Sequence, residues 1–306
     1  MSPSIIEKMG FEKDDKVVIF HIDDMGITHA ANQAAFECLE FGVASSGSVI
    51  TTAPWFMEVA YKCQQNKKFD IGVHVTLTSE YSTCRWRPLS TVDPKTGLFD
   101  KEGYFWRTLV EAAEHVDPDA AIKEMRAQVK MALNNGIDLT HIDCHMGTVV
   151  HPNFIWGYLS VAQEFNLPAY LPRPTPELIK DRNLGEYTDL IFELTKQLEE
   201  EDFPFVDHWV AYGHTLSESE DKTGFYIELI DSLKPGLSHL LFHPSKMDPE
   251  LKALDHLLAE GITCLPLARH QDYEAFTDPR LKKHVEASGV KVIGYREIRD
   301  FIRKNS

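Results

Sequence analysis

Short apolar segments alternate with longer helical patterns along almost the whole sequence, and this alternation limits the fold more than any other feature. Segments rich in Val, Ile, Leu and Phe occupy residues 16–22, 46–51, 69–77, 138–145, 169–171, 238–243, 262–265 and 290–293. Continuous apolar strands separated by helices are typical of a parallel sheet that is covered on both faces. About eight such units favour a TIM-like (β/α) barrel, whether regular, distorted or incomplete, over an open doubly wound sheet.

The helical patterns lie between these segments, at residues 28–41, 54–65, 118–134, 152–165, 186–200, 224–233 and 249–258. Thr28 has the position of an N-cap, and Gly136 that of a glycine that ends a helix. No low-complexity tract, repeat or Gly/Ser linker divides the sequence, so we expect a single (β/α)-barrel domain over residues 1–306. The longest segment without clear periodicity, at about 79–107, contains Trp86 and Trp106 and is predicted to be a structured loop.

Composition excludes several kinds of partner. The 31 Lys and Arg residues face 47 Asp and Glu residues, a net charge of −16, which argues against nucleic acid and anionic membrane surfaces. We find neither a signal-peptide pattern nor an apolar run of about 18 residues, so we expect neither secretion by a standard signal nor a membrane span. The five cysteines are scattered and never form a C-x-x-C pair, which is typical of a cytoplasmic protein.

Four predicted strands end in, or beside, side chains that can bind a metal ion or transfer a proton. The residues concerned are Asp23 and Asp24, then His74, then His141, Asp143 and His145, and finally His243. The strand ends of a parallel barrel meet at one rim, where barrel enzymes have their active sites. The two-residue period puts His141, Asp143 and His145 on one side of their strand, and His145 is nearest the rim.

Two imidazoles and a carboxylate can hold a divalent ion and leave positions open for water and substrate. Such an ion lowers the pKa of a bound water from about 15.7 to about 7, and a second carboxylate can serve as general base. Each feature alone has a structural interpretation as a turn, a helix cap or a hydrogen-bonded core histidine. Four of them at four strand ends favour the functional interpretation, and buried polar groups without partners would cost a few kcal/mol each.

These motifs resemble those of the YdjC-like carbohydrate deacetylase family. The matching segments, in the family's order, are D-D-M-G at 23–26, G-V-H-V-T-L-T at 72–78, T-H-I-D-C-H at 140–145 and H-P-S at 243–245. The segments around Arg269 and at 295–298 are also similar. The resemblance spans nearly the whole chain.

The resemblance implies a barrel like that of polysaccharide deacetylases and removal of acetyl groups from N-acetylated sugars, including chitin-derived oligosaccharides. It implies one divalent metal ion held by Asp24, His74 and His145, usually magnesium in the family, whereas the ligand set itself would also suit zinc. By the same resemblance Asp23 would be the base and His243 the general acid. Arg173 would orient the base or the acetyl carbonyl, and the protein would form a homodimer.

Some residues depart from the family pattern. Cys144 replaces a serine and Gly147 replaces a second histidine, so a site that needs that histidine would lack it. Trp86 and Trp106 could stack on a sugar ring or form a small hydrophobic core under their loop. Two alternatives therefore stay open: a metal-dependent hydrolase of another amide, an ester or a phosphoester, and a barrel that binds sugar without catalysis.

Overall fold

The computed structural model describes residues 4–181, 184–211, 220–254 and 265–305. Within these residues the strands are all parallel and lie in the order β4-β3-β2-β1-β6-β5, with β7 paired to the first half of β1. Their bounds are β1 Lys16–Met25, β2 Ser46–Val49, β3 Ile71–Val75, β4 Leu139–Cys144, β5 His208–Ala211, β6 Gly236–Phe242 and β7 Lys291–Val292. The predicted parallel α/β architecture is confirmed.

Two short pairings join the outer strands β4 and β5 and make the sheet barrel-like. Ala169 pairs with Ile142 of β4, and Pro172 pairs with Val206, just before β5. The Tyr170 N–H donates to the Ile142 carbonyl at 2.8 Å. Between β4 and β5 the sheet therefore consists of isolated bridges and not of a regular strand. The chain there contains the predicted strand 169–171 and the Pro172 that follows it. The sheet is barrel-like and irregular on that side.

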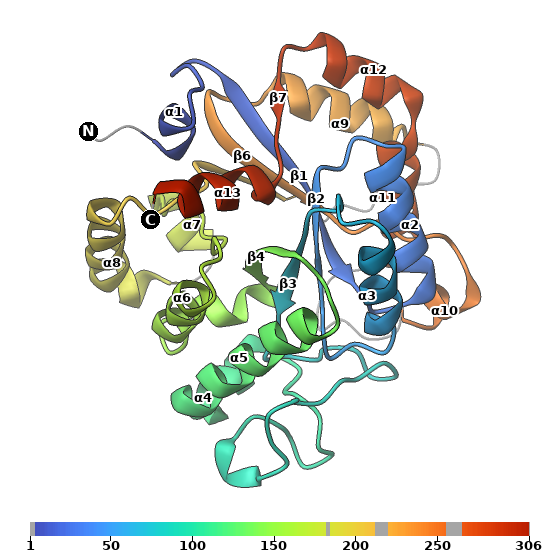
Figure 1. The fold of residues 1–306 in the computed structure, drawn as a ribbon. Helices are drawn as coiled ribbons and strands as arrows, with labels where there is room; N and C mark the ends of the chain where they lie inside the picture. Colours follow the sequence, from blue (N-terminus) through green and yellow to red (C-terminus); the bar gives the residue numbers. More distant parts are fainter. Residues whose placement is uncertain (1–3, 182–183, 212–219, 255–264, 306) are drawn as a thin grey trace.

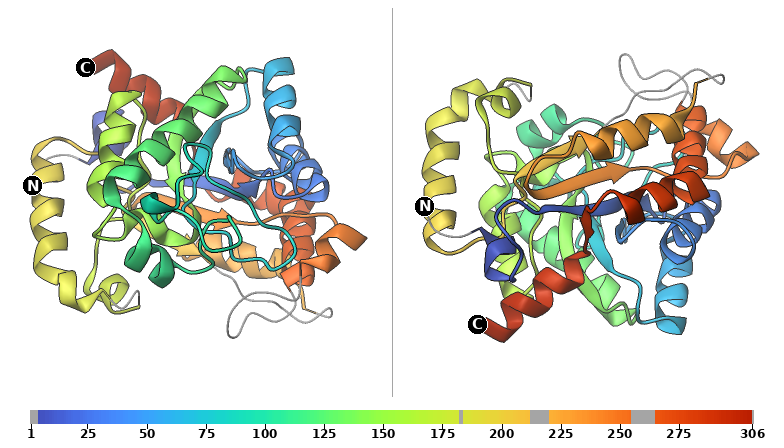
Figure 2. Two further views of the ribbon diagram at one scale, coloured as in Figure 1. Left: turned by 90° about the horizontal axis from the view of Figure 1, so that it is seen from below. Right: turned by 90° about the horizontal axis from the view of Figure 1, so that it is seen from above.

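Helices surround the sheet (Figures 1 and 2). In Figure 1, α2, α3 and α11 lie on one side of the strands, and α5, α6 and α8 lie on the other. The α-helix bounds are α1 Ile5–Lys8, α2 His29–Glu40, α3 Phe56–Gln65, α4 Leu109–His115, α5 Pro118–Asn134, α6 Ile155–Glu164, α7 Pro176–Asp181, α8 Thr188–Glu200, α9 Lys222–Asp231, α10 Pro249–Ala253, α11 Leu265–Thr277, α12 Pro279–Ala287 and α13 Tyr295–Asn305. The 3₁₀ helices are η1 Pro94–Thr96, η2 His145–Val150 and η3 Gly185–Tyr187.

The sequence signals for helix ends act as predicted. The Thr28 hydroxyl accepts a hydrogen bond from the Ala31 N–H at 3.0 Å and begins α2. Helix α5 has the predicted bounds, and Gly136 after it has φ of +77°. Of the predicted strand 262–265 only Leu265 is described, and that residue begins α11. Residues 255–264, which include the end of the predicted helix 249–258, lie outside the described residues.

The strands turn apolar residues outward and polar residues inward. Ile71, Val73 and Val75 of β3 belong to the main apolar core with the surrounding helices. Many of the alternate residues of the central strands are polar or small, and they include His21, Ser48, Gly72, His74, His141, Asp143 and His239. Nearer the amino ends of β1 and β6, Val17, Ile19 and Leu237 belong to a second, smaller apolar cluster. A barrel of this size is usually filled by branched aliphatic side chains. A polar interior requires that these side chains find partners within the barrel.

The segment 79–107 is a structured loop, as predicted, and hangs below the strand ends in Figure 1. It is tied to the barrel by a bridge between Thr78 and Trp106 and closed on itself by a bridge between Phe99 and Phe105. No helix in the described part of the chain is long and apolar enough to cross a membrane.

Candidate active site

Asp24, His74 and His145 meet at the carboxyl ends of β1, β3 and β4. Asp24 Oδ1 lies 3.5 Å from His74 Nε2 and 3.1 Å from His145 Nδ1, and the three side chains are buried. Asp24 has φ of +65°, in the left-handed region that residues other than glycine rarely adopt. A strained backbone of this kind is typical of functional sites.

Each imidazole of this cluster is held by a carboxylate on its far side. His74 Nδ1 lies 2.9 Å from Asp143 Oδ1, and His145 Nε2 lies 2.9 Å from Glu80 Oε2. Burial disfavours protonated imidazole, but the carboxylates outweigh it: they raise the pKa of His74 well above its usual value and that of His145 to about 9. A carboxylate behind a histidine fixes the ring and makes its other nitrogen a better metal ligand.

The cluster fits a divalent cation. Asp24 Oδ1 is buried and accepts no hydrogen bond, although two ring nitrogens lie close to it. When His74 and His145 donate their other N–H groups to Asp143 and Glu80, three lone pairs converge at this point. That arrangement is costly in a buried site unless a cation binds there. One carboxylate oxygen and two imidazole nitrogens form a common ligand set for such an ion.

Arg269 of α11 pairs with the second oxygen of Asp24 and also donates to the Tyr81 hydroxyl at 3.1 Å. Burial alone would raise the pKa of Asp24, but the Arg269 guanidinium and the neighbouring imidazoles hold it well below its usual range. Asp24 is therefore a permanent anion, as a metal ligand must be.

Asp23, the predicted base, lies beside the cluster. Its Oδ1 is 3.3 Å from His21 Nε2, and its Oδ2 is 3.9 Å from both His74 Nε2 and His243 Nε2. Burial raises the pKa of Asp23 to about 6, against the effect of the nearby imidazoles. A carboxylate with a pKa near neutrality can accept and return a proton at physiological pH.

His243, the predicted acid, is at the end of β6, and its side chain is 34% exposed. Its backbone N–H donates to Asp272 Oδ2 at 3.1 Å. Partial loss of water around the ring, together with the positive charge of Arg269 and the rim imidazoles, lowers the pKa of His243 to about 3. The imidazole is thus neutral at rest, and it can act as an acid only after a proton reaches it during the reaction.

Three further histidines, His21, His141 and His239, form a buried layer beneath the rim. His21 Nε2 lies 2.8 Å from Asp143 Oδ2, so Asp143 links this layer to His74. The His141 ring stacks on Tyr295 at 3.9 Å between ring centroids, and its place depends on Gly72, where a Cβ would lie 2.5 Å from the ring. Asp143 and His141, whose roles the sequence left open, thus support the rim from below.

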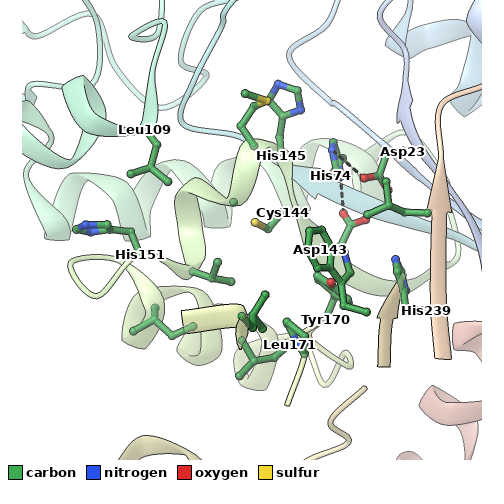
Figure 3. A pocket seen from close by; sticks show the side chains of 18 of the residues that line it. Asp23, His74, Leu109, Asp143, Cys144, His145, His151, Tyr170, Leu171 and His239 are labelled. Atoms are coloured by element: carbon green, nitrogen blue, oxygen red, sulfur yellow. Dashed lines mark hydrogen bonds and ion pairs between the residues drawn. The ribbon is translucent and has the colours of Figure 1, made fainter. Parts of the chain in front are cut away.

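The site opens into a pocket of about 700 Å³. Asp23, His74 and Asp143 gather at one end of it, whereas Leu109, His151 and Leu171 lie further across the cavity (Figure 3). Cys144 and Gly147, where the sequence departs from the family pattern, also line this pocket.

The three predicted substrate-binding residues have other partners and do not line this pocket. Arg173 forms ion pairs with Glu199 and Asp207. Trp86 is only 2% exposed, and its Nε1 donates to the Thr78 carbonyl. Trp106 stacks on His115. The two tryptophans therefore fit the alternative interpretation, a small core under the loop.

Sequence reasoning missed Glu80, which lies only six residues after His74. An acid that follows the G-V-H-V-T-L-T segment was a detectable signal, but its hydrogen bond to His145 depends on how the loop after β3 turns. Arg269 was noted only within a similar segment, and its pairing with Asp24 spans 245 residues.

Comparison with known proteins gives concordant results. The family model described as YdjC-like protein matches residues 17–287. A carbohydrate deacetylase of Thermus thermophilus is 30% identical over 279 residues, covering 91% of this chain and 92% of that protein. A carbohydrate deacetylase of Thermoanaerobacter pseudethanolicus is 27% identical, covering 77% and 84%.

Among solved structures, one from Enterococcus faecalis V583, described provisionally as a cellobiose-phosphate cleavage protein, matches with a TM-score of 0.73. The two proteins are 22% identical, and the match covers 93% of this chain and 99% of the other. At this identity the match establishes the shared fold.

Proposed function

Because this chain belongs to the YdjC-like protein family, we propose that it is a carbohydrate deacetylase that uses a divalent metal ion to hydrolyse the N-acetyl group of an amino sugar. The observation that carries the proposal is the convergence of three ligand atoms, from Asp24, His74 and His145, within 4.8 Å of one another. The pocket beside them is large enough for a sugar.

The ion is assigned to Asp24, His74 and His145. Bound there, it would lower the pKa of a water molecule and polarise the acetyl carbonyl. Asp143 and Glu80 hold the two imidazoles in the orientation that ligation needs, and Arg269 keeps Asp24 ionised and in place. These partners support a preorganised site, whose ligands need little rearrangement on binding.

Asp23 is assigned as the general base that takes a proton from the attacking water. Its raised pKa supports this role, because a base with a pKa near 6 is ionised at pH 7 and still holds a proton well enough to pass it on. The acetamide C–N bond then breaks, the water oxygen stays on the carbonyl carbon as acetate, and the nitrogen leaves as an amine.

His243 is assigned as the group that protonates the departing amine. Since its imidazole is neutral at rest, its proton has to come from the reaction itself. His243 Nε2 lies 3.9 Å from Asp23 Oδ2, so the assigned acid and the assigned base lie at the same end of the pocket, which supports their joint action on one amide. Arg173, Trp86 and Trp106 have no part in this proposal, since they make other contacts.

Acetate release from N-acetylglucosamine oligomers, with and without a chelator, tests the proposal. Acetate production that the chelator abolishes and added metal restores is the expected result. Other products from other amides, esters or phosphoesters would favour the first alternative, and sugar binding without any product would favour the non-catalytic barrel. Elemental analysis of protein purified without added metal distinguishes zinc from magnesium. The homodimer, the cytoplasmic location and the single domain over 1–306 stay predictions.

A further inference from the structure

The pocket does not end at the polar rim. It continues toward α6, α7 and α8, which lie together on one side of the barrel (Figures 1 and 2). We call this part the apolar chamber and define it by Ile155, Leu171, Ile179, Ile191, Leu194 and Phe205. All six are buried or half-buried, and none carries a polar side chain.

Helices α7 and α8 each line the chamber with their apolar face. The α8 residues that line the pocket are Leu190, Ile191, Leu194 and Thr195, whereas the charged residues Asp189 and Glu193 of the same helix are exposed. From α7 only Leu178 and Ile179 line the pocket. Among the described residues, α7 and α8 therefore offer the pocket one hydroxyl and no charge.

Such a wall is unsuited to a bare sugar. Each sugar hydroxyl that leaves water needs a new hydrogen-bond partner, and aliphatic carbons provide none. Most polar groups of the pocket lie instead around Asp24 and His74 at the rim, where the reacting amide has to lie, and His151 is further across the cavity. An apolar group gains free energy in the same chamber, by about fourfold in affinity for each methylene that is buried.

On the basis of the proposed function, we infer that the substrate is an N-acylated amino sugar that carries an apolar group of several carbons, and that this group lies in the apolar chamber. Two attachments share this chemistry: an acyl chain longer than acetyl, and an apolar group on the anomeric oxygen. The reaction is the same hydrolysis in both. Water adds across the C–N bond, which gives a carboxylate and an amine.

Two series of substrates test the inference by release of free amine. One series is N-acetyl-, N-butyryl- and N-octanoylglucosamine, and the other is N-acetylglucosamine with methyl, butyl and octyl groups on the anomeric oxygen. We expect kcat/KM to rise about fourfold per added methylene over the first few carbons in one series, which identifies the attachment. Flat or falling values in both series, with acetylated sugars still hydrolysed, would overturn the inference and leave the proposed function intact. Hydrolysis of no sugar amide would remove the proposed function and the inference with it.

Adjacent residues of α8 provide a matched pair of variants. Ile191 lines the chamber, whereas Phe192 does not line the pocket and is 44% exposed. Ile191→Gln should lower the ratio of kcat/KM for the octyl or octanoyl substrate to that for N-acetylglucosamine by at least tenfold, and Phe192→Gln should leave this ratio unchanged. Thermal unfolding and metal content monitor the fold of both. An unchanged ratio in a folded Ile191→Gln protein, or equal reductions in both variants, would contradict the inference.

Discussion

The barrel contains two groups of buried histidines that differ in one respect. The rim histidines, His74 and His145, and two of the three interior histidines, His141 and His239, are all at most 3% exposed. The third interior histidine, His21, shares the Asp143 carboxylate with His74 and so does not belong to this contrast. Burial acts on all four in the same direction, against the charged ring. Yet the pKa of each rim histidine is raised, and those of His141 and His239 are lowered.

The difference is a carboxylate within hydrogen-bond distance. His74 and His145 each have an Asp or Glu oxygen at 2.9 Å. His141 stacks on Tyr295, with the nearest carboxylate oxygen 3.9 Å away on Asp70, and His239 Nδ1 lies 2.9 Å from the Tyr295 hydroxyl. Burial therefore makes a histidine neutral, and a carboxylate behind it makes it a strong ligand. His141 and His239 are thus neutral, while the rim histidines are positioned to bind a cation.

Removal of a rim histidine should have the largest effect. His74→Ala or His145→Ala should lose the metal ion and reduce turnover by about 10⁴-fold or more, since unactivated water of pKa about 15.7 must then react. Metal content and acetate release are the measurements. The interior variant His141→Gln should keep its metal, as should the surface variant His284→Ala. Full metal content in both rim variants would show that the ligand assignment is wrong.

Asp23→Asn should have the second-largest effect on activity. The variant keeps the size of the side chain and removes the base, so turnover should decrease by about 10²–10⁴-fold while the metal stays bound. Steady-state acetate release and elemental analysis of the same sample measure the two quantities. Asp100→Asn, in the loop 79–107 and outside the pocket, is the control. Unchanged acetate release would exclude Asp23 from the mechanism.

The sequence predicts the rim better than it predicts what supports the rim. The strands β1, β3, β4 and β6 coincide largely with segments that the sequence predicts to be strands, and a parallel barrel brings the carboxyl ends of its strands together. For this reason Asp24, His74 and His145 could be grouped from residues more than a hundred positions apart. Strand β5, His208–Ala211, is not among the predicted strands. It has only four residues and begins with a histidine, so it lacks the apolar pattern by which the other strands are recognised.

Contacts that depend on loops and helix orientation could not be predicted in the same way. The hydrogen bond from His145 to Glu80 requires the turn after β3, and the pairing of Arg269 with Asp24 requires the docking of α11. The sequence around an aromatic residue in a long loop looks the same whether its ring stacks on a sugar or packs into a hydrophobic core. The contacts of Trp86 with Tyr81 and His145 could be known only from the folded chain.

Glu80→Gln tests whether the carboxylate partner distinguishes the two groups. The amide oxygen can still accept the His145 N–H, but the charge is lost, so metal affinity should decrease by about 10–100-fold. Titration with metal buffered by a chelator measures it. Glu102→Gln, an exposed acid of the same loop that pairs with Arg85, should have no effect. Equal affinity in wild type and Glu80→Gln would mean that geometry alone makes His145 a ligand.

The smallest effect should come from the interior histidines and should concern stability. The pKa of His239 in the folded protein lies well below 6.5, so below that pH the unfolded chain binds a proton that the folded chain does not. The stability that this residue contributes is complete above pH 6.5 and is lost as the pH falls, at up to about 1.4 kcal/mol per pH unit. Urea unfolding between pH 7 and 5 should therefore show a shallower pH dependence for His239→Gln than for wild type. The same slope in both proteins would mean that His239 is protonated in the fold, and the contrast with the rim histidines would not hold.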